Sequence, residues 1–326
     1  MSRIFSLSSV SSLFLFWALA AFAQSSPLSW QWPNTDFSIK SVDLNEIRSG
    51  GPGKDGIPAV DNPAFLPVSQ EDRIADREPV MTLELDGETP RAYPIRYLMW
   101  HEIANDLVGG IPVTVTFCPL CNSGVIFDGR LDGEVLTFGV SGNLRNSDMV
   151  MYDRQTESWW QQFIGEAIVG EMTGKVLKKL PGWMESWAEF KSRNPDGLVM
   201  DQPGFPRSYG ENPYTGYDSS SQPFLYSGEQ PPHGVPALAR VVVVGDRAWP
   251  LSRFEENAEI VEQGVRISWT AGTASALDGS NLGKSRDVGS IRVRDAVTGE
   301  DIPHDVAFAF AFHAFFPDGT WMLGDS

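Results

Sequence analysis

The five residues Arg91-Ala92-Tyr93-Pro94-Ile95 recur as a near copy, Arg247-Ala248-Trp249-Pro250-Leu251. Each copy follows a run of β-forming residues and precedes a segment with helical spacing and then a strand. A Pro-Asp-Gly turn closes both halves, at residues 195–197 and 317–319. Two landmarks in the same order, with similar elements between them, indicate that one unit was duplicated and used twice.

The pattern of apolar residues predicts the elements of the first half. Strands are expected at residues 80–85, 91–94, 111–117, 125–128, 135–140 and 149–152, and helices at residues 95–108 and 183–193. This mixture predicts an α+β fold: two related β-rich units with one or two helices each, from an internal duplication.

The predicted domain organisation follows from these units. It consists of a signal peptide at residues 1–23, an N-terminal extension at 24–79, a first repeat unit with both cysteines at 80–200, a connection rich in Tyr, Pro and Gly at 201–236, and a second repeat unit without cysteine at 237–326. The connection has almost no periodic apolar pattern and reads either as a plain linker or as a loop packed across a surface.

The first residues have the features of an export signal. Arg3 is followed by an apolar stretch at residues 13–22, and Ala21-Phe22-Ala23 fits a cleavage site. No later segment reaches the roughly 20 apolar residues that a membrane span needs. We therefore expect a periplasmic or secreted protein with no stable membrane insertion after cleavage; an uncleaved anchor is the alternative.

The charge of the chain restricts its partners. It has 42 acidic and 25 basic residues, a formal charge of −17. Like charges raise the cost of each encounter, so nucleic acid and anionic lipid surfaces are excluded as partners. The sequence identifies no partner and no substrate.

Cys118 and Cys121 are the only cysteines of the chain, and they stand at the end of the predicted strand 111–117. In thioredoxin-like proteins such a pair opens a helix; here a second strand follows, as in a metal knuckle. Three functions remain open: a metal site, a thiol-disulfide oxidoreductase in which Cys118 attacks and Cys121 resolves, or a non-catalytic binding module with a structural disulfide. The residues do not decide whether the chain is an enzyme.

A metal at this turn needs further ligands, because two cysteines do not complete a tetrahedral site. The candidate ligands are Cys118, Cys121, His101, Asp148, Met149 and Met151. Methionine beside cysteine favours a soft ion such as copper(I), whereas carboxylate or imidazole favours zinc. For His101, strand and helix lengths leave a gap of about 10 Å to the cysteines, unless the strand bends or the helix packs obliquely.

Several motifs together resemble an exported bacterial family, Domain of Unknown Function 3179. They are Tyr93-Pro94, residues 101–106 (HEIAND), residues 117–123 (FCPLCNS), residues 141–144 (SGNL), residues 147–153 (SDMVMYD) and Trp160-Gln161. The resemblance covers most of the chain, and it implies a shared architecture and export. It implies no activity, because none is assigned to that family.

Overall fold

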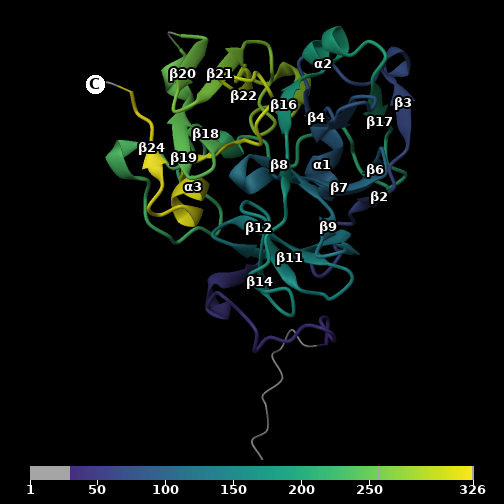
Figure 1. Ribbon diagram of the computed structural model, residues 1–326, viewed down its shortest axis with the longest axis vertical. Coiled ribbons are helices and arrows are strands. Elements are labelled where there is room, and N and C mark those ends of the chain that lie inside the picture. The colour runs from purple at the N-terminus through teal and green to yellow at the C-terminus, as the bar shows by residue number, and fades with distance from the viewer. Residues whose placement is uncertain (1–29, 256, 325–326) are drawn as a thin grey trace, which may run out of the picture. The chain divides into compact units, whose positions relative to one another are not determined.

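The computed structural model describes residues 30–255 and 257–324. The predicted signal peptide, residues 1–23, lies outside the described residues. From Asn34 onward the chain forms one compact unit, to which the following description applies (Figure 1). None of the helices in the described ranges is long and apolar enough to cross a membrane.

This unit is mostly β, so the prediction of two related α+β units is wrong. Its strands form five small, blade-like sheets and one separate hairpin. The described residues contain three α-helices of seven residues each: α1 (Ile95–His101), α2 (Trp187–Arg193) and α3 (Ala309–Phe315). Helices this short cannot cover the face of a sheet, and the main hydrophobic core takes residues from both halves of the sequence.

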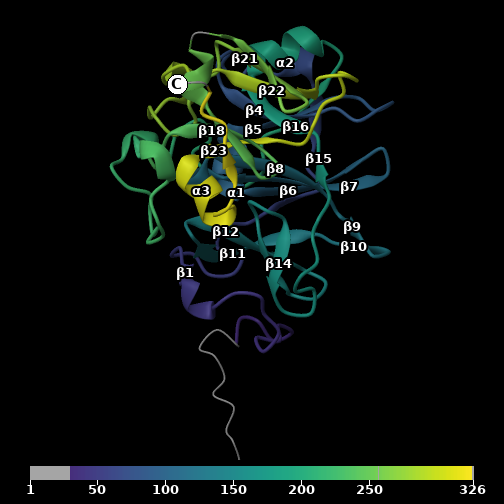
Figure 2. The same ribbon diagram turned by 60° about the vertical axis from the view of Figure 1, so that its left-hand side comes forward.

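Two sheets carry the candidate site. The Cys sheet has the order β15 (Lys179–Leu180), β8 (Ser123–Asp128), β7 (Ile111–Cys118), β6 (Ile103–Val108) and β2 (Val60–Asp61). The Asp148 sheet has the order β1 (Ile47–Ser49), β11 (Phe138–Arg145), β12 (Asp148–Asp153), β13 (Trp159–Gln161) and β14 (Glu166–Val169). β12 lies just below β8 in both views (Figures 1 and 2).

The other strands complete three sheets and the hairpin. Their orders are β16 (Gly182–Ser186), β4 (Pro79–Leu83), β5 (Arg91–Pro94), β17 (Leu198–Met200), β3 (Phe65–Pro67); β23 (Asp305–Phe308), β18 (Arg240–Val244), β19 (Arg247–Pro250), β24 (Thr320–Trp321); β20 (Glu259–Glu262), β21 (Val265–Thr270), β22 (Ser290–Asp295); and the hairpin β10 (Glu134–Val135), β9 (Arg130–Leu131). Short 3-10 turns lie at Leu44–Glu46, Val68–Gln70, Pro119–Cys121, Tyr217–Ser219, Pro232–Gly234, Leu251–Phe254 and Leu282–Lys284.

The recurring motif marks a sheet pattern within this single core. Residues 91–94 form β5 and residues 247–250 form β19, and each is the second strand of an antiparallel hairpin. In both sheets the hairpin is flanked by an antiparallel strand on one side and a parallel strand on the other. The two sheets therefore have the same order and direction of four strands, and both pack into one core.

Strand prediction was better than helix prediction. The expected strands 111–117, 125–128 and 149–152 are confirmed as β7, β8 and β12. The expected helix 95–108 is wrong beyond His101: Glu102 adopts a left-handed conformation (φ +60°), and the chain continues as β6, which pairs along its length with β7. Sheet pairing overrides the helical spacing here.

The expected helix 183–193 is divided in the same way. Its first residues belong to β16, and only Trp187–Arg193 is helical as α2. Ser186 caps this helix, because its hydroxyl accepts a hydrogen bond from the Glu189 amide. The helix-like spacing of the tryptophans therefore continues across a strand and a helix.

Candidate metal centre

The cysteines lie where the chain reverses between β7 and β8. β7 ends at Cys118, Pro119–Cys121 forms a 3-10 turn, and Cys118 pairs with Ser123 at the start of β8. Asn122 completes the reversal in a left-handed conformation (φ +51°), which asparagine adopts more readily than most residues. The predicted strand-turn-strand setting is confirmed.

This turn is held in place by the last part of the chain. The Asn122 side-chain amide donates a hydrogen bond to the Val306 carbonyl oxygen at 2.6 Å. The carboxylate of Asp305 accepts hydrogen bonds from the Ser123 hydroxyl and, at 3.0 Å, from the Gly124 amide. Asp305 and Val306 belong to β23, so the second half of the sequence positions the cysteine turn of the first.

Asp148 arrives at the cysteines from a tight hairpin. It is the first residue of β12 and pairs with Arg145 at the end of β11. Asn146 and Ser147 between them both have positive φ, at +50° and +65°, as the central residues of a type I′ turn do. Cys118 Sγ lies 4.0 Å from the Ser147 carbonyl oxygen, which places this hairpin directly against the cysteine turn.

The three side chains form a compact cluster. One carboxylate oxygen of Asp148 and the two sulfurs lie within 4.8 Å of one another. Cys118 is 1% exposed, and Cys121 and Asp148 are fully buried. Zinc bonds of about 2.3 Å to sulfur and 2.0–2.2 Å to oxygen put neighbouring ligand atoms somewhat closer than this limit. Small side-chain movements therefore suffice for a shared ion.

The Asp148 carboxylate is oriented by two donors on one side only. Its Oδ2 accepts hydrogen bonds from Gln161 Nε2 at 2.6 Å and from the Phe163 amide at 3.0 Å. Among the described residues, no N–H or O–H group donates to Oδ1, although this atom is buried. Burial raises the pKa of Asp148 to about 6, while these hydrogen bonds and those of the thiols act in the opposite direction.

The thiols are held in their protonated form. Burial raises the pKa of Cys118, and it raises the pKa of Cys121 well above the ordinary value, with the neighbouring thiol and Asp148 acting in the same direction on Cys121. Both cysteines are free rather than bonded to each other. A nucleophilic cysteine needs a lowered pKa, so this environment is unlike that of a reactive Cys-x-x-Cys pair.

Glu102 adds a further buried acid beside the cluster. Burial raises the pKa of its carboxyl to about 8, and the charge of Asp148 contributes to the shift. No hydrogen bond to this carboxyl is formed by the described residues. The sequence offered one signal for Glu102 that was missed: it is the one acidic residue in the run His101-Glu102-Ile103-Ala104.

The other predicted ligands have separate places. His101 is not in the cluster: its ring nitrogens lie 2.7 Å from the Pro58 carbonyl oxygen and 2.5 Å from the Tyr209 hydroxyl. Met151 is fully buried in the main core, and Met149 lines a pocket beside the cluster. Ligation by the methionines and a catalytic role of the cysteines stay predictions.

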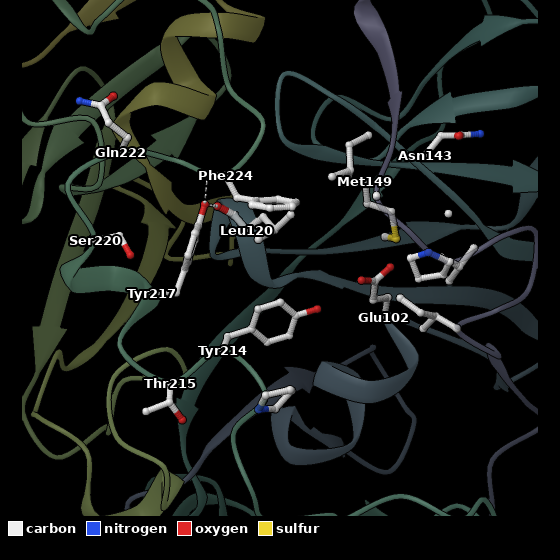
Figure 3. Close-up of a pocket in the computed structure, with 17 residues that line it drawn as sticks. Glu102, Leu120, Asn143, Met149, Tyr214, Thr215, Tyr217, Ser220, Gln222 and Phe224 are labelled. Atoms are coloured by element: carbon white, nitrogen blue, oxygen red, sulfur yellow. Dashed lines mark hydrogen bonds between the residues drawn. The ribbon is translucent and has the colours of Figure 1, made fainter.

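The pocket has a volume of about 560 Å³ and lies beside the cluster, because its lining includes Leu120 and Met149, the sequence neighbours of Cys121 and Asp148. Met149 from β12 and Glu102 line it on one side, and Leu120 from the cysteine turn lies beside Tyr217 on the other (Figure 3). Residues 213–224 of the connection line the other side, where the Tyr217 hydroxyl donates to the Leu120 carbonyl oxygen at 3.0 Å and accepts from the Phe224 amide at 3.1 Å. This part of the connection is thus packed across a surface.

The chain belongs to the protein family of unknown function DUF3179, whose model matches residues 54–319. The match includes the cysteine turn, Asp148 and Glu102, but begins after β1, and it confirms the resemblance found in the sequence. Neither a search of curated proteins nor one of solved structures found a match.

Replacing Glu102 tests the burial of its acid. Between pH about 4.5, its ordinary pKa, and about 8, the folded protein keeps a proton that the unfolded chain has lost, so the free energy of unfolding falls as pH rises. Glu102→Gln removes this contribution to the pH dependence of the free energy of unfolding. We expect the stability of the variant relative to wild type to grow across that pH window, measured by urea unfolding of metal-free protein. The exposed Glu134→Gln control should follow wild type; parallel curves for Glu102→Gln would contradict the assignment.

Proposed function

We propose that the protein binds a single metal ion of the zinc class through Cys118, Cys121 and Asp148. The observation that carries this proposal is the Asp148 carboxylate, whose buried Oδ1 lacks an N–H or O–H donor among the described residues while its Oδ2 has two. Two thiols lie within reach of the same carboxylate. An ion would contact all three buried groups at once, and the two thiols would release their protons on binding.

The donor set favours zinc over copper. Two thiolates and one carboxylate are common zinc ligands, and a fourth position would remain for water or another group. Copper(I) prefers an all-sulfur or sulfur and imidazole set, and the described cluster contains a hard carboxylate oxygen. The thiol-disulfide oxidoreductase is the weaker alternative, because burial raises the pKa of both thiols.

Metal content and thiol content should be measured on one sample purified without chelator. We expect one equivalent of metal in wild type, loss of it in Cys118→Ser, Cys121→Ser and Asp148→Asn, and thiolate-to-metal charge-transfer bands on substitution with Co²⁺. Asp153→Asn is the matched control, since Asp153 is also fully buried and lies on β12, yet is outside the cluster.

Other outcomes separate the alternatives. Metal-free protein with two titratable thiols that cycle against a glutathione buffer would support the oxidoreductase instead. A disulfide that resists reduction, in a fold that tolerates Cys→Ala, would support the structural bond. Metal retained by Asp148→Asn with unchanged affinity would remove the carboxylate from the site.

Gln161 acts on the ion through Asp148. Outer partners of metal ligands typically change affinity by about 10–100-fold, so we expect Gln161→Met to weaken Zn²⁺ binding within that range without changing its stoichiometry. Gln162→Met is the control, because Gln162 is equally buried but donates to Thr116 at 2.8 Å rather than to Asp148. Equal losses in both variants would indicate a general effect on folding.

We also propose that the protein works outside the cytoplasm, on the basis of the signal-like residues 1–23. Two neighbouring thiols are prone to oxidation in such a compartment, and a bound ion would keep them as thiolates. Mass spectrometry of the protein from the cell envelope or medium should show an N-terminus at Gln24. An intact N-terminus on cytoplasmic protein would contradict export.

A further inference from the structure

The pocket beside the cluster has the composition of a site for a small molecule. Its lining is largely apolar and aromatic, and the described residues that form it include no Lys, Arg or His. Its volume of about 560 Å³ is within the usual range for binding sites of small organic molecules. An anionic ligand would find no cationic side chain here, whereas an apolar one would bury its surface.

Two polar groups converge on this apolar space. Glu102 and Tyr214 point toward one another across the pocket (Figure 3), and the Glu102 charge acts on the Tyr214 hydroxyl. Glu102 is only 9% exposed. No hydrogen bond to either group is formed by the described part of the chain, so both can pair with a bound molecule.

The pocket wall formed by the connection is hydrogen-bonded to the cysteine turn. Through its hydroxyl, Tyr217 joins the Cys118–Cys121 turn to the backbone at Phe224, which also lines the pocket. The pocket is therefore formed by fixed side chains of the connection and the two site sheets, and binding requires little ordering of the wall.

We propose that this pocket binds an uncharged, mainly apolar small molecule, oriented through one of its oxygens, which accepts hydrogen bonds from the carboxyl group of Glu102 and the hydroxyl of Tyr214. Anions, including phosphorylated compounds and carboxylates, are excluded because the lining offers them no cationic side chain. The site goes beyond the proposed metal centre and does not depend on it, because no residue of the cluster itself lines the pocket.

The probe for this site is Nile red, an uncharged apolar dye with a carbonyl oxygen whose fluorescence rises in apolar surroundings. We expect one saturable site on the full-length mature protein. The anionic dye 8-anilinonaphthalene-1-sulfonate should not compete for it. Competition by the anionic dye at similar concentration would overturn the predicted ligand class.

A bulky side chain at the mouth of the pocket tests where the dye binds. Ser220 is exposed and lines the pocket, so Ser220→Trp should fill its mouth and weaken Nile red binding at least about 10-fold, as loss of a few buried contacts does. Ser219→Trp is the matched control, because Ser219 is equally exposed but lines a different pocket. Equal binding by Ser220→Trp and wild type would place the dye elsewhere and overturn the proposal.

The polar pair and the metal are tested separately. Tyr214→Phe should weaken binding by about 5-fold, the effect of one hydrogen bond, while leaving the pocket volume nearly unchanged. Cys118→Ser, which lacks the proposed metal site, should bind Nile red as wild type does. Weaker dye binding by well-folded Tyr214→Phe, with unchanged binding by Cys118→Ser, would support the hydrogen bond from Tyr214 to the ligand. An unchanged affinity of Tyr214→Phe would overturn that hydrogen bond, whether or not the metal is found.

Discussion

The burial of several acids in one place is the constraint on which the site depends. Cys118, Cys121, Asp148 and Glu102 lie close enough for their charges to affect one another, and burial raises the pKa of each. The Lys179 ammonium acts on Asp148, but it also faces Asp305 and donates to the Phe163 carbonyl oxygen. Burial therefore favours the protonated forms of Glu102 and the two thiols, and a cation bound beside them would favour ionised thiols.

Short strands and tight turns create this concentration of acids. The β7-β8 turn presents two sulfurs, and the β11-β12 hairpin presents Asp148 from another sheet. Each turn uses residues that tolerate positive φ, Asn122 in the first and Asn146 with Ser147 in the second. The fold thus supplies metal-ligand geometry from loops held rigidly by paired strands, an arrangement that suits binding better than a free loop would.

The sequence predicted the local parts of the site and missed the parts that depend on long-range pairing. The strand before Cys118 follows from alternating apolar residues, and the cysteines meet because they are three residues apart. Asp148 was a candidate among several, but nothing local shows which sheet lies against the turn. Glu102 was placed inside a helix, since helical spacing continues past the point where β6 pairs with β7.

The same limit explains the wrong fold class. The repeat of Arg91–Pro94 at Arg247–Pro250 predicted two units, and periodicity assigned helices to residues 95–108 and 183–193, each of which is part helix and part strand. Sequence periodicity records which residues are buried. It does not record which distant strand buries them, and in this fold strands from both halves share one core.

The hydrogen bonds from Asn122 to Val306 and from Ser123 and Gly124 to Asp305 also set an order of events in biosynthesis. All residues through β23 must leave the ribosome, and the translocation channel if the protein is exported, before β23 can dock on the cysteine turn. Assembly of this centre is therefore a late step, and a nascent chain stalled ahead of β23 would carry both sulfurs without their native support.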